Sequence, residues 1–282
     1  MARRPAGPAD AGTLYVVATP IGNLGDMSER AVETLRAADL ILAEDTRPTR
    51  VLLDHFGVRK RPQAAHQHNE ARMIPVVLDR LARGERIALV SDAGTPLVSD
   101  PGSRLVRAVR DAGFRVSPVP GASALTAALS AAGLDTRQFT FWGFLPRSGR
   151  ERRETIAEIS SAPRTSVLYE AAPRVSTTLQ ELANAGNAGR RCVVARELTK
   201  LYEEFREGTV AELAAYYADT APRGEVVILL AAVEPAMVSE EDLRKRVTAL
   251  RNAGHSARDI ATALTAELGV PRNAVYRLAL ET

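Results

Sequence analysis

The stretch Leu14-Tyr15-Val16-Val17-Ala18 decides the fold class, because it opens the first of several units that share one pattern. This short apolar run predicts a buried strand, and the loop Pro20-Ile21-Gly22-Asn23 follows it. Ser28 then suits the N-cap of a helix with one apolar face, and Leu40-Ile41-Leu42-Ala43 predicts the next strand. The unit is therefore strand, loop, helix, strand.

The same alternation of apolar runs and helical patterns continues to about Val233 and is typical of an α/β protein. Ile87–Val90 predicts a strand, and we expect the following helix to open at Pro101, with Asp100 available as its cap. A further strand is expected at Val116–Val119. The later strands are expected at Phe139–Phe144, Ser166–Tyr169, Cys192–Arg196 and Val226–Ala231. Short connections between successive strands around Glu203–Glu207 indicate a mixed sheet.

We predict four segments along the chain. They are a disordered tail (1–12), an N-terminal α/β domain (13–120), a C-terminal α/β domain (121–235) and a helical, helix-turn-helix-like appendage (236–282). In the appendage, Ser256 is expected to cap the second helix and Pro271 to open the third, after a turn at Gly269.

The composition is that of an ordinary globular protein, with 45% hydrophobic and 25% charged residues. The net charge of +3 suits an anionic partner but does not require one. No apolar run approaches the roughly 20 residues of a membrane span, and the first residues lack the apolar centre of a secretory signal. The single cysteine, Cys192, lies in an apolar run, where a buried strand thiol is favoured over a nucleophile. We therefore expect a cytoplasmic protein without membrane association.

Three loops after predicted strands are the first candidates for chemistry. They are Thr19–Asn23, Ser91–Pro96 and Pro120–Ser123, and ligands in open α/β sheets bind at the carboxyl ends of strands. We expect all three to face one crevice, with Gly94 and Gly121 allowing close backbone approach. Tight turns use the same residue types, so each loop alone could be only a turn. The sequence contains neither a G-x-G-x-x-G nor a P-loop pattern.

A second group of polar residues follows the strand at Leu40–Ala43. It comprises Glu44-Asp45-Thr46-Arg47 and, further on, His66 and His68-Asn69-Glu70. Their spacing is not diagnostic of zinc, and Glu44 and Asp45 could instead cap a helix from Thr46, so no metal site is predicted. An acid, a base or a substrate clamp is the favoured interpretation.

Together these loops resemble the tetrapyrrole methylase superfamily of enzymes that use S-adenosylmethionine (SAM), and most closely its branch acting on small-subunit ribosomal RNA. The likeness spans roughly Gly12 to Thr282. It rests on eight strings in order: Ala18–Leu24, Ala43–Arg47, His68–Glu70, Ser91–Pro96, Ser99–Gly102, Phe144–Arg147, Tyr169–Arg174 and Arg196–Lys200.

The resemblance implies a two-domain α/β fold that binds SAM in the cleft between the domains. It also implies a homodimer that methylates the 2′-hydroxyl of a cytidine ribose in the decoding region of 16S rRNA. Relatives acting on precorrins have a Gly-rich first loop, whereas this chain has Thr-Pro-Ile-Gly-Asn, which favours RNA over a tetrapyrrole. The alternatives are a SAM-dependent methyltransferase of the precorrin type and a non-catalytic RNA-binding assembly protein.

Site residues follow from the resemblance position by position. The residues expected to hold SAM are Pro20, Ile21, Asp92, Gly94, Thr95, Ser123, Ala124, Tyr169, Glu170 and Glu225. A ribose hydroxyl is a poor nucleophile at neutral pH, and the candidate bases are Asp45, Glu44 and His68.

Cationic residues in the same loops could grip the phosphates beside the target ribose, because guanidinium groups match phosphate oxygens. They are Arg47, Arg147, Arg174 and Lys200, and surface ion pairing is the alternative. In the terminal helices a basic and aromatic RNA contact is offered by Arg272, Asn273, Tyr276 and Arg277, although that segment could equally be a small packing domain.

Overall fold

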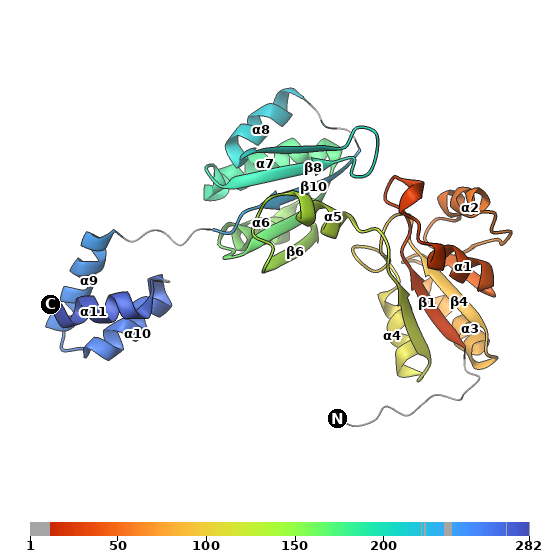
Figure 1. The fold of residues 1–282 in the computed structure, drawn as a ribbon, viewed down its shortest axis with the longest axis horizontal. Coiled ribbons are helices and arrows are strands. Elements are labelled where there is room, and N and C mark those ends of the chain that lie inside the picture. Colours follow the sequence, from red (N-terminus) through yellow and green to blue (C-terminus); the bar gives the residue numbers. More distant parts are fainter. Residues whose placement is uncertain (1–11, 221, 223, 234–238, 269, 282) are drawn as a thin grey trace. The chain divides into compact units, whose positions relative to one another are not determined.

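A computed structural model of the chain describes residues 12–220, 222, 224–233, 239–268 and 270–281. These residues form two compact units, one within 1–160 and 165–231 and the other comprising 161–164 and the described part of 232–282. Figure 1 shows the helices and strands along the chain. The predicted tail lies outside the described residues except for Gly12. None of the described helices is both long and apolar enough to cross a membrane.

The first sheet of the larger unit is entirely parallel and has the strand order β3-β2-β4-β1-β5. Its strands are β1 (Thr13–Val17), β2 (Leu40–Ala43), β3 (Gln63–Ala64), β4 (Arg86–Val90) and β5 (Arg115–Val119). The four strands predicted in this region are confirmed, while the two-residue β3 was not predicted. β1 therefore lies inside the sheet, between β4 and β5.

Helices cover both faces of this sheet, because successive strand residues point to opposite faces. Ile41 and Ala88 pack with α1, whereas Leu42 and Leu89 pack with α3 and α4. Ser28 caps α1 as predicted, its Oγ accepting from the Ala31 backbone N–H. The helices are η1 (Leu24–Asp26), α1 (Glu29–Ala37), α2 (Thr46–His55), α3 (Glu70–Ala82) and α4 (Ser103–Asp111).

The start of α4 differs from the prediction. The helix begins at Ser103 after Gly102, so Pro101 does not open it and Asp100 does not cap it. The side chain of Glu70, which is only 6% exposed, instead accepts a hydrogen bond of 2.8 Å from the Leu105 backbone N–H. A carboxylate from α3 therefore satisfies the first turn of α4, where the helix dipole favours negative charge.

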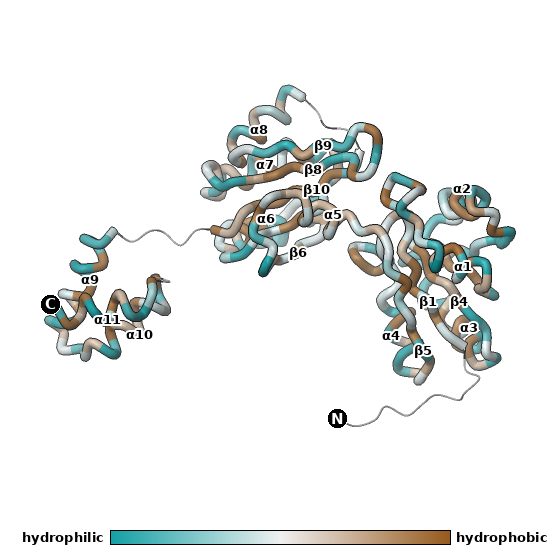
Figure 2. The backbone as a smooth tube through the Cα atoms, in the orientation of Figure 1, coloured by the Kyte–Doolittle hydropathy of each residue, from teal (hydrophilic) through white to brown (hydrophobic). Residues whose placement is uncertain are grey.

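The second sheet is mixed, as predicted, with the order β6-β7-β10-β8-β9. Its strands are β6 (Phe139–Phe144), β7 (Thr165–Ala171), β8 (Arg191–Arg196), β9 (Glu204–Thr209) and β10 (Glu225–Leu230). Only β6 and β7 are parallel. In Figure 2 the central strands are mainly apolar, while polar and apolar positions alternate along the helices.

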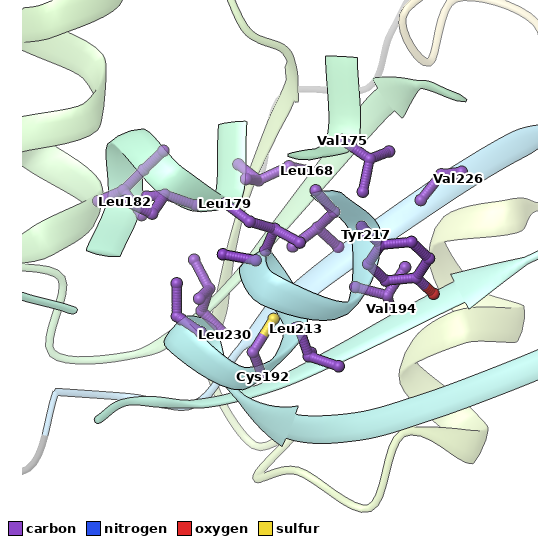
Figure 3. Packing of buried hydrophobic residues seen from close by; sticks show 14 of the residues in the cluster. Leu168, Val175, Leu179, Leu182, Cys192, Val194, Leu213, Tyr217, Val226 and Leu230 are labelled. Carbon is purple, nitrogen blue, oxygen red and sulfur yellow. The ribbon is translucent and has the colours of Figure 1, made fainter. Parts of the chain in front are cut away.

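One face of the second sheet packs against α6 (Gly149–Ser160), α7 (Val175–Leu182) and α8 (Val210–Asp219), with η2 (Ala172–Arg174) and η3 (Ala183–Asn187) beside them. Figure 3 shows this core, which includes the thiol of Cys192. Cys192 is fully buried, as predicted, and burial raises the pKa of its thiol to about 12.

The opposite face packs against α5 (Ala124–Ala131), whose Ala128 and Leu129 belong to the same buried apolar cluster as Val193 and Val227. Because α5 shares the core of the second sheet, we retain the proposal of a domain boundary between residues 120 and 121.

The smaller unit contains α9 (Glu240–Asn252), α10 (Ala257–Leu268) and α11 (Arg272–Glu281) around an apolar cluster of its own. Ser256 caps α10 as predicted, since its Oγ accepts from the Asp259 backbone N–H. The predicted turn residue Gly269 lies outside the described residues.

Candidate functional site

The three loops selected from the sequence meet at the carboxyl ends of β1, β4 and β5. Thr19 and Gly94 exchange backbone hydrogen bonds of 2.9 and 3.1 Å, and Thr95 Oγ1 donates to the Ala122 carbonyl at 3.1 Å. The prediction that these loops face one crevice is therefore confirmed.

The two predicted loop glycines allow the loops to approach one another. Gly94 has a φ of +76°, and a Cβ there would lie 3.1 Å from Ile21 Cγ2. A Cβ on Gly121 would lie 3.0 Å from that of Ala18. A side chain at either position would thus meet a neighbouring residue of another loop. The close approach of the loops therefore explains why glycine stands at these positions, independently of any ligand.

A cavity of about 630 Å³ opens at this junction and also receives residues from the second sheet. Nine of the residues predicted to hold SAM line it: Ile21, Asp92, Gly94, Thr95, Ser123, Ala124, Tyr169, Glu170 and Glu225. Pro20 lies elsewhere, in a smaller pocket of about 200 Å³ formed with Leu24, Pro48 and Val51. Asp92 borders both pockets.

The cavity has an acidic wall made by Glu44, Asp92 and Asp100. Burial, followed by the charges of Asp100, Asp92 and Asp45, raises the pKa of Glu44 above its ordinary value. Burial also raises the pKa of Asp100, to which the charge of Asp92 contributes. Carboxylates gathered in this way favour a cationic ligand, which would relieve their mutual repulsion.

Tyr169 and Glu170, at the end of β7, hold the second-sheet side of the cavity. The Tyr169 hydroxyl accepts a hydrogen bond of 3.0 Å from the Leu125 N–H at the start of α5, and burial raises the pKa of that hydroxyl. The Glu170 carboxylate is fully buried and accepts from the Ala171 N–H at 2.9 Å and from Thr178 Oγ1 at 2.6 Å. Glu170 thus acts as an internal anchor, since its carboxylate is occupied by its own chain.

The three candidate bases occupy different surroundings. Glu44 lines the cavity. Asp45 caps α2, and hydrogen bonds from the Arg47 side chain and backbone lower its pKa to about 2. His68 is exposed and is not among the lining residues; its ring centroid lies 6.0 Å from that of His66. Of the three, only Glu44 is among the residues that line the cavity.

The predicted RNA contacts also divide by environment. Arg47, with 88% of its side chain exposed, pairs with Asp45, and Arg147 is exposed. Arg174 is partly buried, 3.3 Å from Glu170, and donates to the Leu145 and Pro146 carbonyls. Lys200 pairs with Glu197 at 3.0 Å and lies 3.7 Å from Glu225.

Arg272 and Arg277 are exposed on α11 of the smaller unit. Among the described residues, no group of three or more His, Cys, Asp or Glu side chains could hold a metal ion.

Several lining residues were not predicted, including Phe144, Val98, Ser99 and Leu198. Positive φ angles at non-glycine residues mark two of the loops that supply these residues, but this signal is visible only in the structure. The non-glycine residues with positive φ in the described chain are Leu97, Ser99, Glu197 and Thr199, all in the two loops that supply Val98, Ser99 and Leu198. Such backbone strain gathers at functional sites.

Comparison with known proteins identifies the family to which this fold and this cavity belong. The family model of tetrapyrrole (corrin/porphyrin) methylases matches residues 13–214. The chain belongs to the tetrapyrrole methylase family. Solved structures with this fold include a cobalt precorrin-4 methyltransferase (TM-score 0.59, 19% identity, covering 79% of this chain and 95% of that one). Another is a diphthine synthase (TM-score 0.61, 18% identity, covering 78% and 90%). At these identities they establish the fold alone.

Curated relatives within the family are much more similar. The ribosomal RNA small subunit methyltransferase I of Xylella fastidiosa (strain Temecula1) is 47% identical over 268 residues, covering 94% of this chain and 98% of its own length. The protein of the same name from Escherichia coli O157:H7 is 46% identical over 276 residues, covering 96% and 95%. The similarity therefore extends through the two α/β sheets and into the C-terminal helices of this tetrapyrrole methylase.

Proposed function

We propose that the chain transfers the methyl group of SAM to the 2′-hydroxyl of a cytidine ribose in the decoding region of 16S rRNA. One observation carries the proposal: relatives that are 46–47% identical over nearly the whole chain are named for methyl transfer to small-subunit rRNA. In the same proposal the protein acts in the cytoplasm as a homodimer.

The acidic cavity is the proposed site of SAM. SAM carries a sulfonium and an ammonium group against one carboxylate, so a wall containing Glu44, Asp92 and Asp100 suits it. The volume of about 630 Å³ also lies within the usual range of small-molecule sites. When bound, SAM supplies an electrophilic methyl group, and the protein's contribution is to align the acceptor oxygen with it.

Glu44 is the proposed base that takes up the proton of the ribose hydroxyl. It lines the cavity, and its raised pKa makes its carboxylate a stronger base than a free glutamate. The Asp45 carboxylate is held by Arg47 and has a pKa of about 2, so it is a weak base. We propose Asp45 as a positioning residue for Arg47 and for the start of α2.

Arg47 is the proposed phosphate contact on the side of the first sheet, because its guanidinium is 88% exposed while its backbone is fixed at the start of α2. Arg47→Ala should leave the Kd of SAM unchanged and lower methylation of the RNA about tenfold, since a charge-assisted phosphate contact is lost. The two values are obtained by calorimetry and by methyl-transfer kinetics, and unchanged turnover would remove Arg47 from the RNA site.

The test of the proposed function is transfer of radiolabelled methyl from SAM to 30S subunits from cells that lack the gene, with nuclease mapping of the product, and, in a parallel assay, to a tetrapyrrole acceptor. Label in a 2′-O-methylcytidine is the expected result. Label in a tetrapyrrole acceptor, with none in rRNA, would favour the precorrin-type alternative. SAM binding with no transfer to either acceptor would favour a non-catalytic RNA-binding protein.

A further inference from the structure

Phe144 is an exposed aromatic residue at the mouth of the cavity. It is the last residue of β6, lines the cavity and leaves 55% of its surface open to solvent. An exposed phenylalanine contributes little to a core, so core stability does not explain this side chain. An irregularity in β6 explains the direction of the Phe144 side chain.

A β-bulge directs Phe144 to the same side as Phe141. The register of β6 on β7 shifts between Phe141 and Gly143, and Phe144 then lies opposite Tyr169. In a regular strand residues 141 and 144 would point to opposite faces, yet both rings contact Tyr169 edge-on, with centroids 4.8 and 5.6 Å away. The extra residue therefore turns Phe144 toward the cavity, a use of bulges that is frequent beside active sites.

The backbone after Phe144 is held in place by two guanidinium groups. Arg152 donates to the Pro146 carbonyl at 3.0 Å, and Arg174 donates to the Leu145 and Pro146 carbonyls at 3.1 and 3.3 Å. Arg152 is only 5% exposed and also donates to Thr178. These hydrogen bonds fix the backbone beside the exposed ring of Phe144, which lowers the conformational entropy lost when a ligand stacks on the ring.

Arg147 follows on the same loop and is exposed. Within the described part of the chain its guanidinium has no hydrogen bond or ion pair, in contrast to Arg152 and Arg174. An exposed cation three residues after an exposed aromatic side chain fits a single-stranded nucleic acid, which offers a phosphate and a base with a flat π surface.

We infer that Phe144 is the stacking platform for a nucleobase of the acceptor RNA, either that of the methylated nucleotide or its immediate neighbour. The inference rests on the proposed function, since it gives Phe144 the role of positioning the RNA within the same site. Stacking tolerates any base, so Phe144 supplies affinity and orientation rather than sequence choice.

The test compares four variants with the wild-type chain: Phe144→Ala, Phe144→Leu, Phe144→Trp and Phe139→Ala. Phe139 is the matched control, because it lies at the other end of the same strand, is 41% exposed and does not line the cavity. Each variant is assayed for methyl transfer to 30S subunits and for SAM binding by calorimetry.

Phe144→Ala and Phe144→Leu should each lower kcat/KM for the RNA about tenfold, within the range expected for the loss of one base–aromatic stack. Phe144→Trp should restore it, Phe139→Ala should match the wild type, and the Kd of SAM should stay within about twofold throughout. Because leucine is apolar but lacks a ring, it separates stacking from mere filling of space.

Three outcomes would overturn the inference. If Phe144→Leu is as active as the wild type, no stacking occurs. If Phe144→Ala weakens SAM binding as much as RNA methylation, the ring serves the cofactor instead. If the wild-type chain itself labels no RNA, the proposed function fails and this inference fails with it.

Discussion

Replacing Glu170 by glutamine tests whether the buried anchor at the end of β7 holds this side of the cavity. The Thr178 hydroxyl accepts a hydrogen bond from Arg152 at 2.8 Å and donates its one proton to the Glu170 carboxylate at 2.6 Å. An amide NH2 cannot accept that proton, so a glutamine with its NH2 toward Thr178 would lose this hydrogen bond, and keeping the bond requires the amide oxygen to face Thr178. Its NH2 then faces the Ala171 N–H and the Arg174 guanidinium, which are both donors.

The variant therefore loses one hydrogen bond within the chain and the charge pairing with Arg174. Each hydrogen bond to a buried charged group contributes about 1.5–3 kcal/mol. Arg174 is 29% exposed, so water compensates part of its loss, and we expect a net cost of about 3 kcal/mol. In a unit of this size that corresponds to a fall in Tm of about 6–12 °C.

Circular dichroism melting of Glu170→Gln beside Glu207→Gln measures this difference. Glu207 pairs with Arg191 on the surface of the same sheet, with both side chains about half exposed, so its loss should shift Tm by no more than about 2 °C. If Glu170→Gln melts at the same temperature as Glu207→Gln, the reasoning about donors and acceptors around Glu170 is refuted.

Three further predictions concern charge, burial and the C-terminal helices. The raised pKa of Glu44 means that the folded state holds the proton of this residue more tightly, so the contribution of Glu44 to the stability of the wild type falls as the pH rises above 4.5. Relative to the wild type, the Tm of Glu44→Gln should therefore increase as the pH rises from 4.5 through the raised pKa of Glu44, and a difference in Tm that stays constant over this range would contradict this. The buried thiol of Cys192, with a pKa of about 12, should react with iodoacetamide about a thousandfold more slowly in the native than in the urea-unfolded chain; labelling of native protein at the unfolded rate would contradict its burial. Deleting the chain from Ser239 should leave SAM binding intact, since α9–α11 have their own apolar core, and should reduce RNA methylation if Arg272 and Arg277 contact RNA; normal methylation would exclude that contact.

Sequence reasoning worked where a local signal was complete. Leu40–Ala43 is an uninterrupted apolar run and forms β2, and Ser28 and Ser256 cap the helices that follow them. β3 escaped prediction because two residues, Gln63 and Ala64, are too short to show a period.

Long-range partners account for the other differences. The start of α4 depends on Glu70, which lies 35 residues earlier in the chain than Leu105, so the local signal at Pro101 was misleading. Phe144 reaches the cavity through a bulge, which the alternation of a regular strand does not reveal. Arg174 was selected by its motif as an RNA contact, but whether a guanidinium faces solvent or the Leu145 carbonyl depends on packing between η2 and the loop after β6.

The central position of β1 also has a consequence for biosynthesis. β1 is made first, but its neighbours β4 and β5 begin about 70 and 100 residues later. At about 5–20 residues per second, translation leaves the apolar segment Leu14–Val17 without its sheet partners for several seconds. Chaperone binding to the nascent chain should therefore peak before Arg115 emerges from the ribosome, and slow codons between β1 and β5 should lower the yield of folded protein.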